Sequence, residues 1–186
     1  MDPVSLDRVF FLLCVPIALS WGGIGCWFDL TQRRLPNWWL LGGAVGLAMG
    51  FGVALLRAAA TSGDPATVVS SVGAGAGLWF GAYLLAFLLV PRSIGAGDVK
   101  LAAILGGGVG MAAGDAVAAA VFIGAAIVLA AVLTLLIAGF IAGRRNHGNR
   151  RKTIMTSISD SVPHGPAMLL AAGIVCGFSG GWASGV

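Results

Sequence analysis

Hydrophobic and polar positions are distributed along the chain in long blocks rather than in a short-period alternation. Six apolar stretches, separated by short polar connections, cover residues of about 9–28, 38–56, 67–90, 99–113, 116–142 and 163–182. A helix needs about 20 apolar residues to cross the hydrocarbon core of a membrane. The alternating polarity of membrane strands is absent, which leaves helices as the spanning elements. The pattern therefore predicts an all-α, polytopic membrane bundle of about six transmembrane helices, forming a single domain over residues 1–186.

The fourth stretch, residues 99–113, is shorter than the others and rich in glycine. As a helix it would rise only about 22 Å, at roughly 1.5 Å per residue. The hydrocarbon core is about 30 Å thick. We therefore expect this segment to be tilted, broken or half-buried in protein.

Composition agrees with a membrane protein. The chain is 58% hydrophobic and only 10% charged, and its mean hydropathy is +0.96. Its 30 glycines are typical of helices that pack closely through small residues. The formal net charge of +4 could indicate nucleic-acid binding, but the basic residues cluster at the ends of apolar stretches, which favours a role in membrane orientation. We expect no nucleic-acid partner.

The distribution of basic residues predicts which side of the membrane each connection occupies. Nine of the 11 Lys and Arg residues fall in three alternate connections: Arg33, Arg34, Arg92, Lys100, Arg144, Arg145, Arg150, Arg151 and Lys152. The positive-inside rule places these connections in the cytoplasm and both termini outside. The first stretch is preceded by two Asp and one Arg, the wrong charge for a cleaved signal peptide, so we expect it to remain in the mature protein.

Few residue types are available for chemistry. The chain has no Glu, and its seven acids are Asp2, Asp7, Asp29, Asp64, Asp98, Asp115 and Asp160. Its three cysteines lack metal-ligand spacing and are expected to pack in apolar segments, and its two histidines, His147 and His164, are too isolated for a zinc site. Motifs for nucleotide binding, zinc proteolysis and serine hydrolysis are absent. We therefore expect no metal and no cofactor.

Two of the acids, Asp29 and Asp98, lie at membrane boundaries on the predicted cytoplasmic side. Two carboxylates brought together cannot both ionise cheaply near neutral pH, so one of them keeps its proton. The charged one can then activate water, while the protonated one polarises a carbonyl group. Gly95 and Gly97 lie just before Asp98 in the sequence, and a backbone without Cβ atoms lets a peptide approach the acid closely.

Each of these residues also has a purely structural interpretation. Asp98 could be the N-cap of the fourth helix, and Asp29 could pair with Arg33 at i,i+4 spacing. Lys100 could be an anchor that extends to the membrane interface. The basic run 144–152 could simply meet anionic lipid headgroups. From the single residues, these alternatives remain open.

Three motifs together resemble those of the bacterial prepilin peptidases, membrane aspartyl proteases of the G-x-G-D type, and in particular the short Tad/Flp-type members. Residues 29–37 (DLTQRRLPN) resemble the first aspartate motif of the family, and residues 95–101 (GAGDVKL) resemble its second. Residues 162–166 (VPHGP) are similar to the turn that opens the last helix, although aromatic residues are commoner at the position of His164.

The resemblance implies that Asp29 and Asp98 are the catalytic pair. It further implies cleavage of prepilin-like precursors, just before their hydrophobic helix, at the cytoplasmic face of the bacterial inner membrane. Within the two motifs, Gly95, Gly97, Lys100 and Asn37 are expected to bind the substrate. Longer relatives carry a cysteine-rich domain between the first two spans and also methylate the new terminus. Here that connection is short, so we expect no methyltransferase activity.

The substrate helix must lie beside Asp98, and the glycines at positions 106, 107, 108 and 110 are expected to leave room for it, unless they only pack against neighbouring helices. Three other functions compete with this interpretation: a related protease for archaellin-type precursors or signal peptides, a small transporter, and a non-catalytic assembly subunit. The transporter is disfavoured because both acids lie at one boundary rather than at the midplane of a span.

Overall fold

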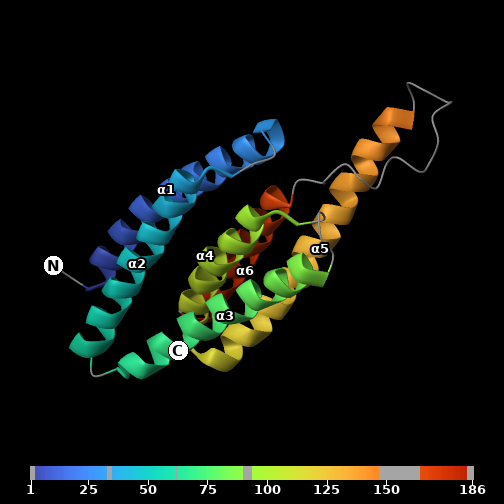
Figure 1. Ribbon diagram of the computed structural model, residues 1–186. Coiled ribbons are helices and arrows are strands. Elements are labelled where there is room, and N and C mark those ends of the chain that lie inside the picture. The colour runs from blue at the N-terminus through green and yellow to red at the C-terminus, as the bar shows by residue number, and fades with distance from the viewer. Residues whose placement is uncertain (1–2, 33–34, 62, 90–93, 147–163, 184–186) are drawn as a thin grey trace.

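The computed structural model describes residues 3–32, 35–61, 63–89, 94–146 and 164–183. Within these residues the chain forms six helices and no strand, which confirms the all-α prediction (Figure 1). The helices are α1 (Pro3–Gln32), α2 (Asn37–Ala60), α3 (Pro65–Leu89), α4 (Ala96–Ala113), α5 (Ala116–Asn146) and α6 (Gly165–Ala183). The helix α5 extends beyond the predicted stretch, so Arg144 and Arg145 lie in its last turn rather than in a connection.

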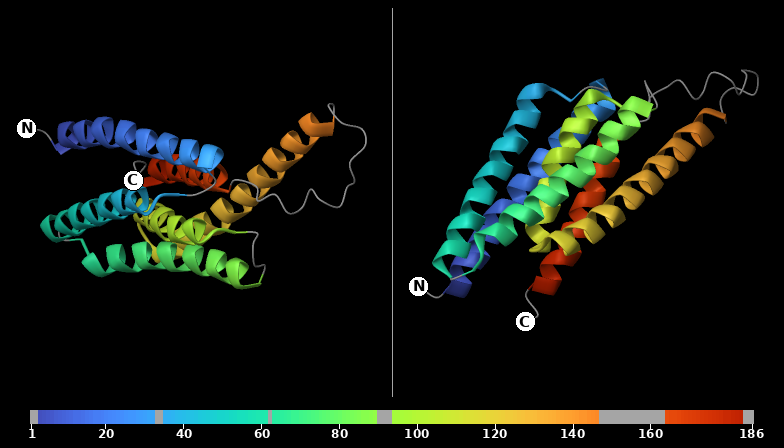
Figure 2. Two further views of the ribbon diagram at one scale, coloured as in Figure 1. Left: turned by 45° about the horizontal axis from the view of Figure 1, so that its top comes forward. Right: turned by 60° about the horizontal axis from the view of Figure 1, so that its bottom comes forward.

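Helix α4 is the centre of the bundle. It contacts α2, α3, α5 and α6, whereas α1 lies against α6 at the edge (Figures 1 and 2). The second half of α5 leans away from the other helices. The largest fully buried apolar side chains share one hydrophobic core and come from all five of the helices α2 to α6: Trp39, Trp79, Leu101, Val109, Ile123 and Met168.

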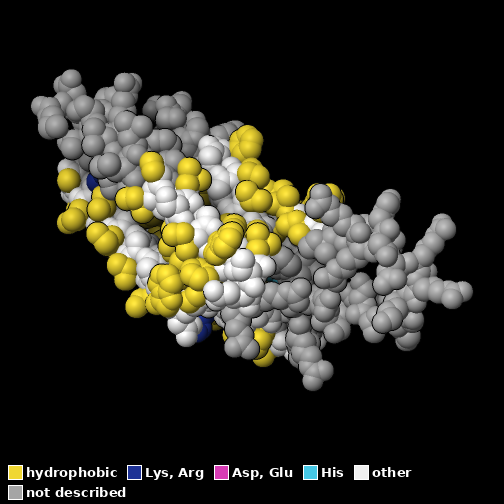
Figure 3. Space-filling view, turned by 90° about the horizontal axis from the view of Figure 1, so that it is seen from above, with side chains coloured by type: hydrophobic (Ala, Val, Ile, Leu, Met, Phe, Trp, Pro, Cys, Tyr) yellow, Lys and Arg dark blue, Asp and Glu magenta, His cyan; other side chains and the backbone are white. Residues whose placement is uncertain are grey.

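The surface of the bundle fits a lipid environment. Helices α2, α3, α4 and the Ala116–Phe140 part of α5 are each long and apolar enough to cross a membrane, and α6 has a shorter apolar part, Gly165–Phe178. Large hydrophobic side chains such as Leu56, Val117 and Leu135 are more than 70% exposed. Figure 3 shows hydrophobic side chains spread over the described part of one face. Because such exposure is unfavourable in water, the chain is a helical membrane bundle, as predicted.

The glycines of α4 serve helix packing, which corrects one expectation. Helix α4 is continuous and half-buried in protein. A Cβ at Gly106 or Gly110 would collide with the backbone of α3, and one at Gly107 would lie 2.7 Å from Leu47 Cδ2. The expectation that these three glycines leave room for a substrate helix is therefore wrong, because α3 and α2 already occupy that room. Of the four glycines at positions 106, 107, 108 and 110, only Gly108 has no heavy atom within 4 Å of an added Cβ.

This packing predicts opposite effects for two matched substitutions in α4. Gly106→Ala should destabilise the bundle by about 1–3 kcal/mol, because the new methyl group forces α3 and α4 apart. Gly108→Ala should be neutral or stabilise it by about 0.5–1 kcal/mol, because it meets open space and alanine favours a helix. Both effects are measured as a change in the unfolding temperature of the detergent-solubilised protein. This is the temperature at which heating removes the monodisperse peak. Equal unfolding temperatures for the two variants would contradict the assigned packing.

Two tryptophans join α1 to α2. The rings of Trp21 and Trp39 stack with centroids 4.1 Å apart and planes 4° from parallel. Each indole N–H donates to the backbone carbonyl of the other tryptophan, at 3.1 Å in both cases. The ring of Trp39 lies over Gly25, and that of Trp21 lies over Gly43, where any Cβ would collide with the indole. This reciprocal clamp fixes α1 at Trp21 and Gly25, about two turns and one turn before Asp29.

Candidate active site

Asp29 lies in the last turn of α1 and is buried, with 7% of its surface exposed. The backbone N–H of Gly165, the first residue of α6, donates to Asp29 Oδ2 at 3.0 Å. The two residues are 136 positions apart in the sequence. A buried carboxylate needs such a donor, and the N-terminus of a helix supplies a backbone N–H together with the positive end of the helix dipole.

Asp98 is the third residue of α4 and is half-buried. Its Oδ2 accepts a hydrogen bond from the backbone N–H of Gly95 at 3.1 Å. Gly95 is the N-cap residue and Asp98 is the third residue of the helix, so the alternative in which Asp98 is the N-cap is wrong. Asp98 nevertheless helps to cap α4 from the third position, as acidic residues do in a capping box. The carboxylate is thereby held at the mouth of the helix.

The fold brings the two aspartates to the same end of the bundle. The C-terminal end of α1 and the N-terminal ends of α4 and α6 meet there (Figure 2). Asp98 lies close enough for its charge to disfavour ionisation of Asp29. The imidazole of His164 lies within electrostatic range of both carboxylates. Two carboxylates in one partly buried place favour a state in which they share a single proton. This arrangement suits general acid–base chemistry.

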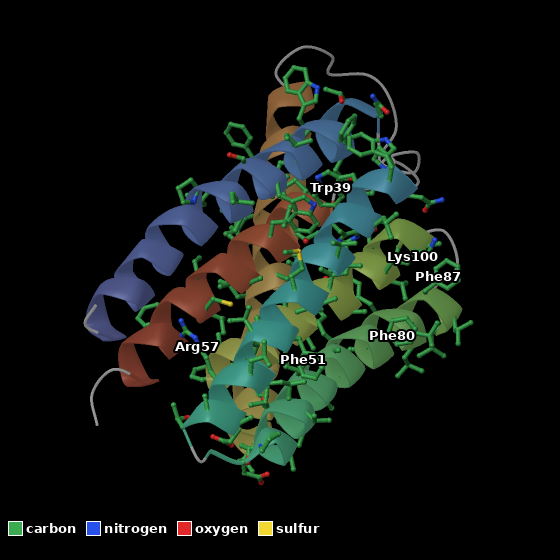
Figure 4. The ribbon with its side chains drawn as sticks, turned by 90° about the vertical axis from the view of Figure 1, so that its left-hand side faces the viewer. Trp39, Phe51, Arg57, Phe80, Phe87 and Lys100 are labelled. Carbon is green, nitrogen blue, oxygen red and sulfur yellow. The ribbon has the colours of Figure 1, made fainter. Side chains whose placement is uncertain are left out.

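The other predicted residues surround α4 at this end. Lys100 Nζ donates to Asn37 Oδ1 at 3.3 Å, so the two sequence motifs are joined by a direct side-chain contact. A Cβ at Gly97 would lie 3.4 Å from Leu35 Cβ, which places Gly97 against the segment that leads into α2. Figure 4 shows Lys100 and Trp39 toward one end of the bundle and Arg57 toward the other. Arg33 lies outside the described residues, and so does its expected pairing with Asp29.

Two residues at this site had no assigned role in the sequence. Gly165 binds Asp29 through its backbone, and His164 acts on both aspartates. The sequence did offer a signal, because both belong to the VPHGP turn that resembles the family's turn. Two histidines are too few for a zinc site, but that argument does not bear on other roles of His164. In the described part of the chain, no three His, Cys, Asp or Glu side chains gather closely enough to hold a metal ion.

Comparison with known families decides the class of protein. The sequence profile of the type IV leader peptidase family matches residues 16–144, more than half of the chain, and this range includes both aspartates. The chain belongs to the type IV leader peptidase family. Comparison with curated proteins gave no match, and comparison with solved structures also gave none. Membership makes the chain a protease of the leader-peptidase kind. The turn with His164 and Gly165 lies beyond the matched range, so its place at the site of this peptidase rests on the structure.

Proposed function

We propose that this family member is an aspartyl endopeptidase that removes the leader peptide of type IV, Tad/Flp-type prepilin-like precursors. The observation that carries the proposal is the meeting of Asp29 and Asp98 at one end of the bundle, each held by a backbone N–H. The two aspartates lie in two motifs more than 60 residues apart, and this end of the bundle supplies no other pair of acids among the described residues.

The reaction needs only the two carboxyl groups and a water molecule. The ionised carboxylate takes a proton from water while the oxygen of that water attacks the carbonyl carbon of the scissile peptide bond. The protonated carboxyl group donates to the carbonyl oxygen and stabilises the tetrahedral intermediate. When the C–N bond breaks, the leaving nitrogen receives a proton from the carboxyl that took one from water. The hydroxyl formed from the carbonyl oxygen returns its proton to the other carboxylate as the new C=O bond forms. The products are a carboxylic acid and an amine, and the pair again holds one proton.

The position of the pair suggests how a precursor would be recognised. A prepilin-like precursor carries its cleavage site directly before a hydrophobic helix, so that site comes to rest at a membrane boundary. The aspartates lie at the helix ends of a bundle with an apolar surface, so the proposal places them at the same membrane boundary as the cleavage site. In the proposal, Lys100 and Asn37, which are both exposed at the same end of the bundle as Asp98, bind the polar segment of the precursor, and Gly95 and Gly97 let its backbone approach.

The orientation and the range of activities are also part of the proposal. The basic connections support a site that faces the cytoplasm at the bacterial inner membrane. The connection between α1 and α2 consists only of residues 33–36, which is too short for the cysteine-rich domain of longer relatives. The proposal therefore has cleavage without N-methylation and without a bound cofactor. A transporter remains disfavoured, because both acids lie at one end of the bundle.

Co-expression with candidate substrates tests the proposed function. Membranes that contain the peptidase and a Tad/Flp-type pilin precursor should yield a shortened pilin whose new N-terminus, read by mass spectrometry, begins directly before the hydrophobic helix. Membranes without the peptidase serve as the control. An archaellin-type precursor and a signal-peptide precursor, tested in parallel, distinguish the related proteases. If the archaellin-type or the signal-peptide precursor is cleaved and the Tad/Flp-type pilin is not, the substrate assignment is wrong. If none of the three precursors is cleaved, the result favours the non-catalytic subunit.

A further inference from the structure

The two residues that directly precede the aspartates, Phe28 and Gly97, both contact the start of α2. The ring of Phe28 meets the ring of Trp38 edge to face, with centroids 5.7 Å apart and planes at 88°. A Cβ at Gly97 would lie 3.4 Å from Leu35 Cβ, which puts the leucine side chain against the first turn of α4. One short segment, residues 35–38, thus touches the chain beside both carboxyl groups. We call this segment the α2 entry.

The helices that carry the aspartates need such a connection. In the described part of the chain, α1 packs against α6, and α4 packs against α2, α3, α5 and α6, but α1 and α4 do not pack against each other along their length. The hydrogen bond from the Gly165 N–H to Asp29 ties the end of α1 to the first turn of α6. A single contact leaves a helix end free to pivot about it. A second contact, on another side, removes that freedom.

The α2 entry is itself a rigid turn that is held on both sides. Pro36 is the N-cap of α2, with φ of −63° and ψ of 138°, and its ring restricts φ to this range. Its carbonyl accepts the N–H of Trp39 at 3.1 Å. Asn37 Oδ1 accepts a hydrogen bond from Lys100 Nζ at 3.3 Å, which ties the turn to α4. The stacked pair of Trp21 and Trp39 ties it to α1. The turn can therefore transmit the position of α4 to α1.

We propose that the α2 entry sets the distance between the carboxyl groups of Asp29 and Asp98, and that Leu35 and Trp38 are positioning residues of the pair. The inference rests on the proposed function, in which the two carboxyl groups act together on one peptide bond. Reacting groups must be held within about 0.5 Å of the productive geometry, and a displacement of about 1 Å can lower a rate about 100-fold. Leu35 and Trp38 act through the residues beside the aspartates.

The kinetics of precursor cleavage by the full-length peptidase, in detergent or liposomes, test the proposal. Trp38→Leu and Leu35→Ala should each lower kcat about tenfold, because the aspartates lose their alignment. KM should change by less than about twofold, because the proposed substrate-binding side chains of Asn37 and Lys100 remain. Trp38→Phe keeps an aromatic ring for Phe28, and Leu35→Met keeps the volume of the side chain. These two conservative variants should restore most of kcat.

Trp27→Leu and Leu41→Ala are the matched controls. Trp27 is 67% exposed and Trp38 is 66% exposed, but of these two rings only that of Trp38 has an aromatic partner among the described residues. Leu41 is 63% exposed and lies in α2, just beyond the α2 entry. Both control variants should cleave with the kcat of the wild type.

A distance measurement tests the proposal without any substrate. Spin labels attached at Gln32→Cys and Ala96→Cys report the spacing of the end of α1 and the start of α4, where both residues are exposed. The three native cysteines are first replaced by alanine. Trp38→Leu should broaden the distribution of distances between the labels, whereas Trp38→Phe and Trp27→Leu should leave it as in the wild type.

Each outcome decides the inference. An unchanged kcat in Trp38→Leu or in Leu35→Ala would overturn it, and so would an unchanged distance distribution in Trp38→Leu. A loss of kcat that Trp27→Leu and Leu41→Ala share would also overturn it. If Leu35→Ala fails to fold, Trp38→Leu decides, because its ring is exposed and lies outside the core. A wild-type protein that cleaves no precursor sinks the proposed function instead, and the distance measurement then decides whether the α2 entry sets the spacing.

Discussion

Asp29→Asn and Asp98→Asn are each expected to abolish precursor cleavage, with rates at least about 10³-fold below wild type. Removal of a group that acts as base or acid costs this much. In the proposed mechanism the two residues act as one unit that shares a proton, so the double variant should be no slower than either single variant. The measurement is the fraction of precursor processed in membranes, with protein amount and insertion checked by immunoblot.

Asparagine separates chemistry from structure at both positions. Its carbonyl oxygen can still accept the N–H of Gly165 at position 29 and that of Gly95 at position 98, so both helix ends remain capped. The matched controls are Asp64→Asn and Asp115→Asn. These two acids cap α3 and α5 by accepting backbone N–H groups at 2.8–2.9 Å, at the other end of the bundle. They should retain activity. Near-normal processing by Asp29→Asn or Asp98→Asn would make that residue structural, and the aspartyl mechanism would fail.

Gly165→Ala is expected to lower the cleavage rate about tenfold or more while leaving the fold intact. A Cβ at this position would lie 3.0 Å from Asp29 Oδ2 and 3.3 Å from its Cγ. The carboxylate must therefore move by several tenths of an ångström, and displacements of this order are costly when reacting groups have to be aligned. The loss should appear in kcat rather than in KM, since the substituted residue touches Asp29 and not the proposed substrate-binding residues.

Gly173→Ala provides the control for that change. It lies two turns further along α6, and an added Cβ there has no heavy atom within 4 Å. The control variant should cleave at the wild-type rate and unfold at or slightly above the wild-type temperature, because alanine favours a helix. If Gly165→Ala and Gly173→Ala have the same kcat, the contact between α6 and Asp29 has no role in catalysis.

The elements of the fold could be predicted because each depends on a contiguous stretch of sequence. Six apolar blocks with polar breaks define six helices, and most of the described helix ends lie within about four residues of the predicted ones. The start of helix α4 is instructive: it begins at Ala96 rather than 99. The GAGD motif therefore forms the first turn of the helix instead of a loop before it. Hydropathy does not detect a turn made of glycine, alanine and aspartate, whereas capping geometry accounts for it.

The contacts that complete the site could not be predicted, because they depend on how distant helices pack. The two aspartates were recognised by their motifs, but nothing local indicates that the N–H of Gly165 binds Asp29. The glycines of α4 illustrate the same difficulty. Their presence predicts close approach of some neighbour, but only the packed structure shows that the neighbour is α3 at Gly106 and open space at Gly108. Likewise, Trp21 and Trp39 appear in the sequence as ordinary aromatic residues near a membrane interface.

The bond between Asp29 and Gly165 also relates the site to the order in which the chain is synthesised. Asp29 belongs to α1 and Gly165 opens α6, so the two partners of this bond leave the ribosome far apart in time. Once α4 has been made, both carboxylates exist in the membrane, yet the amide that binds Asp29 and the helix against which α1 packs have still to be translated. Helix α6 is thus the one that completes the surroundings of Asp29, so a chain truncated before α6 carries both aspartates without the setting that holds them.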